Sequence, residues 1–383
     1  MIIQESDEYL AKQQEQRTKV HAMIDEVAIA RRPKIDYSLT TRPGEDKTAY
    51  HDAYERLAAM LMGDTSALSL KEAVYLSEAP YSKISWQEFD QAIQRMVAHI
   101  GLAMKDRGFS TEDNLAKNMM LYDFFTDTIQ VQPSGYEKPV VSYPMLYDFQ
   151  DFWGKEDHTK LFVSKLMQTG SGQCHSLPLL YMILAEEIGA ESYLAFSPNH
   201  SYVKFQDDLK RWYNIELTNG MFTSDQFVLY SGFINAIALQ NKMYTVPLTK
   251  REVIAQSVND LANAYVAQFG YDPFVLQCTN LSLMHSTRSM TPHQLYNNYH
   301  ATLLDKVIAQ YRQYGLTQEE FERDEHVQKI VNQMSGVQKH LEKLGFADMP
   351  EEQYKDWLTS VQEEGEKQKH RTKMRQLLNQ IND

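Results

Sequence analysis

The chain has few cysteines, no excess of positive charge and no long apolar run, and each absence excludes a class of protein. Its 383 residues include only two cysteines, Cys174 and Cys278, which is too few for a disulfide framework or a cysteine-rich zinc site. The formal net charge of −13 argues against a nucleic-acid surface, which needs a basic patch. No segment has the apolar length of a membrane span. We therefore expect no metal, no cofactor, no nucleic-acid partner and no membrane span.

The N-terminal residues bear on localisation. Residues 1–8 are mostly polar and lack the apolar core of a signal peptide, so the sequence as it stands predicts a cytoplasmic protein. A chain from which a signal peptide had been removed would look the same, and a secreted or periplasmic protein is therefore the alternative.

Hydrophobic patterning divides the chain into three regions. We predict a helical N-terminal region at 1–135, a mixed core at 136–249 and a helical C-terminal region at 250–383. Residues 6–31 are polar and rich in helix-forming Glu, Gln, Lys and Ala, which predicts a helix that ends at Pro33. The helical pattern of the residues predicts helices over the following further segments: 48–62, 68–79, 86–108, 115–130, 158–168, 250–269, 293–314, 317–344 and 351–381.

The C-terminal region contains one hint of a repeat. Residues 261–267 and 295–301 agree at Leu, Asn, Tyr and Ala with an offset of 34 residues, the period of tetratricopeptide-type helix pairs. Two ordinary amphipathic helices are the alternative, because fewer than about three repeats are rarely stable alone. The charged segment after 351 is typical of a solvated helix face, with a protein partner for these C-terminal helices as the other interpretation.

Cys174 lies where a reactive thiol is expected. The turn Gly170-Ser-Gly172 precedes a mostly apolar helix that ends before Gly189, and Pro178 is tolerated only in its first turn. Cys174 is therefore placed at the start of the helix, where the dipole and unpaired backbone amides lower a thiol pKa. The same amides suit an oxyanion.

A predicted hairpin brings a histidine and an acid to one face of a sheet. Because side chains alternate along a strand, His200 and Glu216 share a face, and a hairpin centred on Asp208 places them directly opposite each other, about 5 Å apart at Cβ. A centre moved by one residue puts Asn214 or Thr218 opposite the histidine, so Asn214 is the reserve orienting residue. The strands are predicted at 192–196, 200–206 and 211–217.

Three sequence motifs carry a resemblance to a known superfamily. Gly-Gln-Cys174-His-Ser, Pro-Asn-His200-Ser-Tyr-Val-Lys-Phe and Trp-Tyr-Asn-Ile-Glu216-Leu-Thr-Asn-Gly resemble the motifs of the transglutaminase-like superfamily over residues 140–235. The resemblance implies an α+β fold with a papain-like core, in which a helix bearing the cysteine packs on an antiparallel sheet, with extensive helical N- and C-terminal regions.

The resemblance also implies catalytic roles: Cys174 as nucleophile, His200 as general base and acid, and Glu216 as the residue that orients the histidine. Two features depart from the common pattern, because many members have Asp where Glu216 stands and an aromatic residue where His175 stands. The flanking helices resemble a bacterial branch of often unassigned function. The superfamily includes protein cross-linkers, deamidases, peptidases, peptide N-glycanase-type hydrolases and inactive relatives.

Four further residues are candidates for the site. Gln168 is a candidate second oxyanion donor by analogy with papain-like enzymes, with a helix-surface residue as the alternative. Trp153, Tyr202 and Trp212 could line the cleft, although aromatic residues at such positions also serve as core.

The sequence supports three hypotheses about function. The first is a cysteine-dependent acyl-transfer enzyme, a peptidase, amidase or deamidase, or transglutaminase-like enzyme, that acts on a peptide, protein or amide through a thioester. The second is an inactive module of the same fold that binds a protein or glycan partner. The third, a helical scaffold without a site, does not explain why one small β region concentrates Cys, His and Glu.

Overall fold

The computed structural model describes residues 11–23, 33–40, 44–135, 137–230, 234–347 and 349–382. The protein is α+β, mainly helical with small sheets, as predicted. Its contacts divide it into two compact units, one of residues 39–300 with 333–383 and one of residues 1–38 with 301–332. Every residue of the candidate site belongs to the first unit. The predicted boundaries at 135 and 249 remain a prediction.

The N-terminal helices form largely where they were predicted. They are α2 (Thr48–Met62), α3 (Leu70–Ser82), α4 (Trp86–Asp106) and α5 (Asn114–Thr126), with the short η1 (Thr65–Ala67) between the first two. Ser85 and Glu88 form a capping box on α4. The predicted helix 115–130 is too long, because β-branched residues after Thr126 form β1 (Ile129–Val131), which pairs with β2 (Val140–Ser142). Of the predicted helix 6–31, the structure describes residues 11–23, which are helical.

The segment before Cys174 consists of short pieces. The predicted helix 158–168 occurs as η2 (His158–Leu161) and α6 (Val163–Thr169). The buried Glu78 carboxylate accepts hydrogen bonds from the backbone amides of Val163 (2.6 Å) and Ser164 (2.9 Å), which caps α6 from α3. Two short strands, β3 (Leu146–Tyr147) and β4 (Ser171–Gly172), pair in parallel and lead into α7 (Ser176–Glu187).

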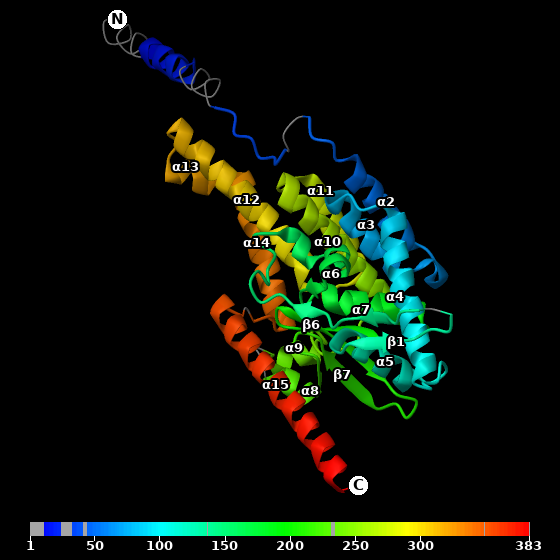
Figure 1. Cartoon of the computed structure of the whole chain (residues 1–383). Helices are drawn as coiled ribbons and strands as arrows, with labels where there is room; N and C mark the ends of the chain where they lie inside the picture. Colours follow the sequence, from blue (N-terminus) through cyan, green and yellow to red (C-terminus); the bar gives the residue numbers. More distant parts are fainter. Residues whose placement is uncertain are drawn as a thin grey trace, which may run out of the picture. The chain divides into compact units, whose positions relative to one another are not determined.

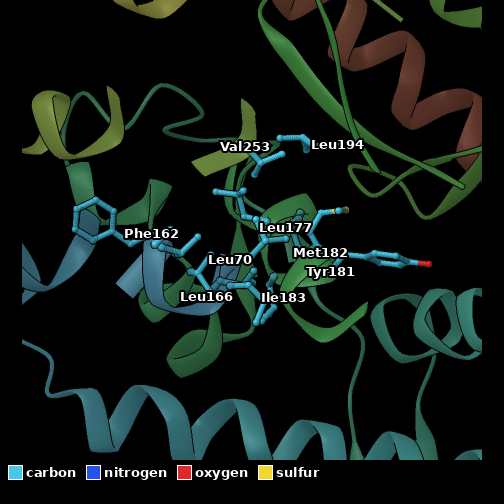
Figure 2. Close-up of a cluster of buried hydrophobic side chains, with 14 of the residues drawn as sticks. Leu70, Phe162, Leu166, Leu177, Tyr181, Met182, Ile183, Leu194 and Val253 are labelled. Atoms are coloured by element: carbon cyan, nitrogen blue, oxygen red, sulfur yellow. The ribbon is translucent and has the colours of Figure 1, made fainter. Parts of the chain in front are cut away.

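α7 is the buried centre of this unit. It packs against helices α3 to α6 and against the sheet that follows it. Figure 2 shows how its apolar side chains meet those of the surrounding elements, among them Leu70, Leu166, Leu177, Ile183 and Leu194. Because α7 follows Cys174 directly, this core fixes the position of the thiol.

The sheet has four antiparallel strands in chain order, β5 (Tyr193–Ser197), β6 (His200–Gln206), β7 (Trp212–Glu216) and β8 (Met221–Thr223). The predicted hairpin centre is wrong by one residue. Val203 pairs with Ile215, so the hairpin is centred on Leu209, which places residue 218 rather than Glu216 at the level of His200. The cause is a three-residue loop in which Lys210 takes a left-handed conformation, with φ 62°.

The remaining elements are helical (Figure 1). The predicted helix 250–269 is confirmed, whereas the helix at 273–285 was missed although Asp272 and Pro273 form a capping signal. The predicted helix 317–344 is interrupted at Asp324. These helices are α8 (Asp225–Tyr230), α9 (Ala236–Gln240), α10 (Lys250–Phe269), α11 (Pro273–His285), α12 (Met290–Tyr314), α13 (Gln318–Arg323), α14 (Glu325–Leu344) and α15 (Glu351–Asn382).

Two predictions from the sequence concern these helices. The similar segments 261–267 and 295–301 lie on α10 and α12, with α11 between them. A tetratricopeptide-like relationship stays a prediction. Within the part of the chain that the structure describes, no helix has the length and apolarity needed to cross a bilayer.

Candidate active site

Cys174 lies in the tight connection between β4 and α7. The Gln173 amide donates to Ser176 Oγ at 3.0 Å, and the Gln173 side chain donates to the carbonyls of Asp148 (3.0 Å) and Asp151 (3.1 Å). A Cβ on Gly172 would lie only 2.6 Å from Ser176 Oγ, so this approach requires glycine. The Cys174 carbonyl accepts a hydrogen bond from the Ser201 hydroxyl on β6, which ties the thiol to the sheet.

The side chains of His200 and Glu216 contact each other on a buried face of the sheet. Glu216 Oε2 lies 2.6 Å from His200 Nε2, and Glu216 Oε1 accepts a hydrogen bond from the Thr218 amide at 2.9 Å. The two side chains share a face, as strand alternation predicted, but lie diagonally because of the shifted register. A diagonal pair is further apart than an opposed one, and the longer glutamate side chain suits this distance better than aspartate.

His200 also interacts with the Cys174 thiol. Because Glu216 takes Nε2, the other ring nitrogen is left for the thiol; Nδ1 is buried and, among the described residues, has no hydrogen-bonding partner other than the thiol. The imidazole and the thiol influence each other through charge and through a hydrogen-bonding contact. The structure therefore brings together the three residues that the sequence predicted.

The pKa values of this group favour an ion pair. Burial acts to raise the pKa of the Cys174 thiol, but hydrogen bonding and the charge of His200 outweigh it and lower that pKa below its ordinary value. Burial acts to lower the pKa of His200, but the Glu216 charge and the thiol raise it to about 10. The pKa of Glu216 is lowered, since His200 and Thr218 outweigh its burial. These directions all favour the charged forms, with thiolate, imidazolium and carboxylate side by side.

A second histidine and carboxylate lie on another side of the thiol. His175 Nε2 lies 3.1 Å from Asp260 Oδ2 on α10, and the Asp260 charge, against the effect of burial, raises the pKa of His175 to about 9. The positive His175 in turn contributes to lowering the pKa of Cys174. Sequence reasoning noted His175 only as a departure from a pattern. Asp260 was missed because it lies far along the chain without a local motif.

Aromatic residues cover the Cys174–His200 pair. The Tyr354 hydroxyl of α15 lies 3.5 Å from Cys174 Sγ, and the Trp357 ring lies 4.4 Å from the His200 ring. Tyr147 on β3 is also buried against the thiol, and within the described part of the chain its hydroxyl makes no hydrogen bond of ordinary geometry. No local signal in the sequence pointed to these three residues, since they reach the thiol only through tertiary packing.

Two predicted polar residues lie elsewhere. Gln168 is exposed on α6 and lines a different surface hollow, together with Lys83 and Glu88, so the prediction that it lies beside the oxyanion is wrong. Asn214 donates from Nδ2 to Asp225 Oδ1 at 2.8 Å, so the reserve orienting role is also wrong. The histidine is held by Glu216 instead.

Of the three aromatic residues predicted to line the cleft, only Trp153 does so. Its ring stacks on Tyr354, with centroids 4.8 Å apart, and it borders the cavity beside Cys174. Tyr202 is wrongly assigned, because it is buried in a small cluster with Ala195. Trp212 is also wrongly assigned, because it is 43% exposed and packs against Tyr193 at the surface.

A cavity of about 290 Å³ adjoins the thiol. Its lining includes the polar residues Asp260 and Gln256 and the aromatic residues Phe152 and Trp153. Burial raises the pKa of Glu78 in its wall to about 7. Its size suits a side chain or a short peptide segment. No grouping of three His, Cys, Asp or Glu side chains fit for a metal occurs among the residues described.

No protein-family model and no curated protein matches the chain. What is known of the site therefore comes from its own geometry and from the three motifs.

The buried Glu216–His200 ion pair is expected to stabilise the fold in a pH-dependent way. Glu216→Gln is expected to lower the free energy of unfolding by roughly 1–3 kcal/mol. The Glu216 contribution is present above its unfolded pKa, about 4.3, and is lost as pH falls through the lowered folded value. The His200 contribution is complete below its unfolded pKa, about 6.5, and is lost as pH rises through about 10. Urea unfolding near pH 5.5 and near pH 10 measures both limits.

The control for this variant is Asp208→Asn, an exposed acid in the hairpin loop, which is expected to change stability little at either pH. A destabilisation by Glu216→Gln that is the same at pH 5.5 and pH 10 contradicts the ion pair.

Proposed function

We propose that this chain is a cysteine-dependent acyl-transfer enzyme of the transglutaminase-like superfamily, with a papain-like core. The observation that carries the proposal is the buried 2.6 Å contact between Glu216 and His200, with the imidazole next to a thiol of lowered pKa. A nucleophile, a base and a residue that orients the base are the parts of a covalent acyl-transfer site.

The reaction begins at the thiolate. Cys174 Sγ attacks the carbonyl carbon of an amide, and the carbonyl electron pair moves to oxygen. The tetrahedral intermediate collapses as the carbon–nitrogen bond breaks, and the His200 imidazolium gives its proton to the leaving amine, which leaves a thioester. Neutral His200 then takes a proton from water or from a primary amine, which attacks the thioester and releases an acid or a new amide.

The oxyanion requires donors that Gln168 cannot supply. The backbone amide of Cys174, next to the first turn of α7, is one candidate. The Tyr147 hydroxyl is the second, because it is buried against the thiol and makes no hydrogen bond of ordinary geometry to any residue that the structure describes. His175 adds a positive charge that favours the thiolate. A histidine at this position, where many superfamily members have an aromatic residue, can therefore help to activate the thiol.

The alternative is a module of the same fold that binds a protein or glycan partner without chemistry. The observation that favours it is the cover over the thiol, where Tyr354 is fully buried and Trp357 is 8% exposed. Retention of the buried Glu216–His200–Cys174 group favours the enzyme, because a binding surface has no need of a buried ion pair, which is costly to desolvate.

Alkylation with iodoacetamide and peptide mapping tests the thiol without a known substrate. We expect Cys174 to react at neutral pH about tenfold faster than an ordinary thiol of pKa about 8.5, because its lowered pKa increases the fraction that is thiolate. Cys278 is the internal control, because it is fully buried and burial raises its pKa. A Cys174 that reacts no faster than a free cysteine counts against the proposal.

Activity is then screened on peptide and glutamine-amide substrates, with Cys174→Ala as the matched inactive chain. Turnover by the native chain that disappears in Cys174→Ala supports the enzyme. Release of ammonia identifies amide chemistry, and incorporation of an added amine distinguishes transfer from hydrolysis. Equal signals from both chains contradict the assignment of Cys174 as nucleophile.

A further inference from the structure

We propose that α15 occupies a polypeptide-binding surface beside Cys174 and blocks that surface to a polypeptide until the helix leaves, while small reagents still reach the thiol through the adjoining cavity. The proposal rests on the proposed function and deepens it, because it makes the acyl substrate a polypeptide that competes with α15. Four features of the α15 contact carry it: the aromatic seat over the thiol, the hydrogen bonds to backbone carbonyls, a glycine at the closest approach and the narrow apolar stripe.

The aromatic seat lies directly over the reactive pair. Tyr354 stacks on Trp153 and reaches the thiol with its hydroxyl, 3.5 Å from Sγ. Trp357 stacks on Tyr354 with centroids 5.5 Å apart and lies against the His200 ring. An acyl group arriving from this side meets the two rings first, so they must move before the thiol can attack it.

The chain bearing these rings is held by its backbone. Asn199, next to His200, donates from Nδ2 to the Met349 carbonyl at 3.2 Å. Asn219, three residues after Glu216, donates from Nδ2 to the Val361 carbonyl. Main-chain carbonyls are present in any polypeptide. Two amide donors that flank the triad can therefore hold a peptide of another sequence in the same place.

The closest approach between α15 and the loop that contains Asn219 depends on one glycine. A Cβ on Gly365 would lie 2.7 Å from both Cβ and Nδ2 of Asn219, and real Cβ atoms do not come so near. Glycine lowers helix stability by about 1 kcal/mol relative to alanine. A glycine inside α15 is therefore unfavourable for the helix itself and suits its contact with the core.

The rest of the contact is a narrow apolar stripe. Tyr354, Trp357, Leu358 and Val361 are buried, at the helical spacing of a groove-binding helix. The ion pair at its start, Lys155–Glu351 at 2.8 Å, has side chains 66% and 44% exposed, and exposed pairs contribute little. α15 is thus held mainly by these few buried apolar side chains. A bound peptide with an aromatic residue can take their place.

Gly365→Ala in the full chain tests the proposal. The measured quantity is the ratio of two alkylation rates at Cys174, for a maleimide carrying a large polyethylene glycol chain and for iodoacetamide. The ratio cancels changes in thiol pKa and reports access alone. We expect this ratio to rise about fivefold or more, because the added Cβ removes a modest part of the free energy that holds α15 on the core. Hydrogen exchange at the α15 amides is expected to accelerate as well.

Gly336→Ala is the matched control. Gly336 is an exposed helical glycine on α14 where an added Cβ meets no atom within 4 Å, so its ratio is expected to stay unchanged. Because alanine favours helix at both positions, loss of fold is not the expected cause of any difference, and circular dichroism checks this.

The outcomes separate this proposal from the proposed function. If the ratio and the α15 exchange rates are unchanged while iodoacetamide still reacts rapidly with Cys174, the proposal for α15 is overturned and the enzyme assignment stands. If Cys174 is as slow as an ordinary thiol with both reagents in every chain, the proposed function fails and this proposal fails with it.

Discussion

His200→Ala is expected to lower the rate of acyl transfer about a thousandfold, within the range that general acid–base catalysis supplies. The variant removes both the proposed proton donor to the leaving amine and the main cause of the lowered thiol pKa. The pH at which Cys174 reaches its half-maximal alkylation rate is therefore expected to rise. Iodoacetamide rates measured from pH 5 to pH 10 give this midpoint.

The same change leaves Glu216 buried without its partner, which destabilises a fold by about 3–5 kcal/mol. The double variant His200→Ala/Glu216→Gln removes that charge and keeps the test valid if the single variant unfolds. His99→Ala is the control, because His99 is a buried histidine on α4 without a carboxylate partner among the described residues. An alkylation midpoint that stays the same in the double variant contradicts the role of His200.

Ile183→Ala is expected to lower the free energy of unfolding by about 2–5 kcal/mol, the usual effect of truncating a fully buried isoleucine. Ile183 is completely buried in α7 and belongs to the cluster in Figure 2. It lies on the helix that follows Cys174, so the variant measures how much the packing of that helix contributes to the stability of the unit that holds the thiol. Urea unfolding monitored by circular dichroism gives the value.

Met284→Ala serves as the control, because Met284 is 66% exposed on α11 and its truncation is expected to change stability by less than about 0.5 kcal/mol. If Ile183→Ala has as small an effect as Met284→Ala, the described packing of α7 is wrong.

The parts of the site that the sequence predicted depend on local patterns. Pro178 can lie only in the first turn of a helix, and the structure accordingly has Cys174 just before α7, whose N-cap is His175. Strand alternation placed His200 and Glu216 on one face. Moving the hairpin centre by one residue moves every pairing partner by two residues, so the two side chains still share a face. The start of α10 was predicted from the helical spacing of apolar residues, and the structure adds a capping box of Thr249 and Glu252 at that point.

Details of the hairpin could not be predicted in the same way. The centre depends on a left-handed Lys210, a conformation that glycine or asparagine usually signals and lysine does not. For the same reason Asn214 was a reasonable reserve candidate until its bond to Asp225 was seen.

The remaining parts of the site come from distant segments. Asp260 lies 3.1 Å from His175, and Tyr354 reaches Cys174 across 180 residues of sequence. Such pairs are set by tertiary packing and leave no local pattern. Gln168 was placed by analogy, and the exposed face of α6 carries it away from the thiol.

Acylation of the native chain by an activated aryl ester tests the central claim most directly. We predict a fast release of about one equivalent of the aryl alcohol per chain, with the acyl group found on the Cys174 peptide and lost after treatment with hydroxylamine. Cys174→Ala is expected to lose the fast phase, and the Cys278 peptide is expected to stay unmodified. The absence of a fast phase, or acyl groups on residues other than Cys174, would contradict a thioester mechanism at this site.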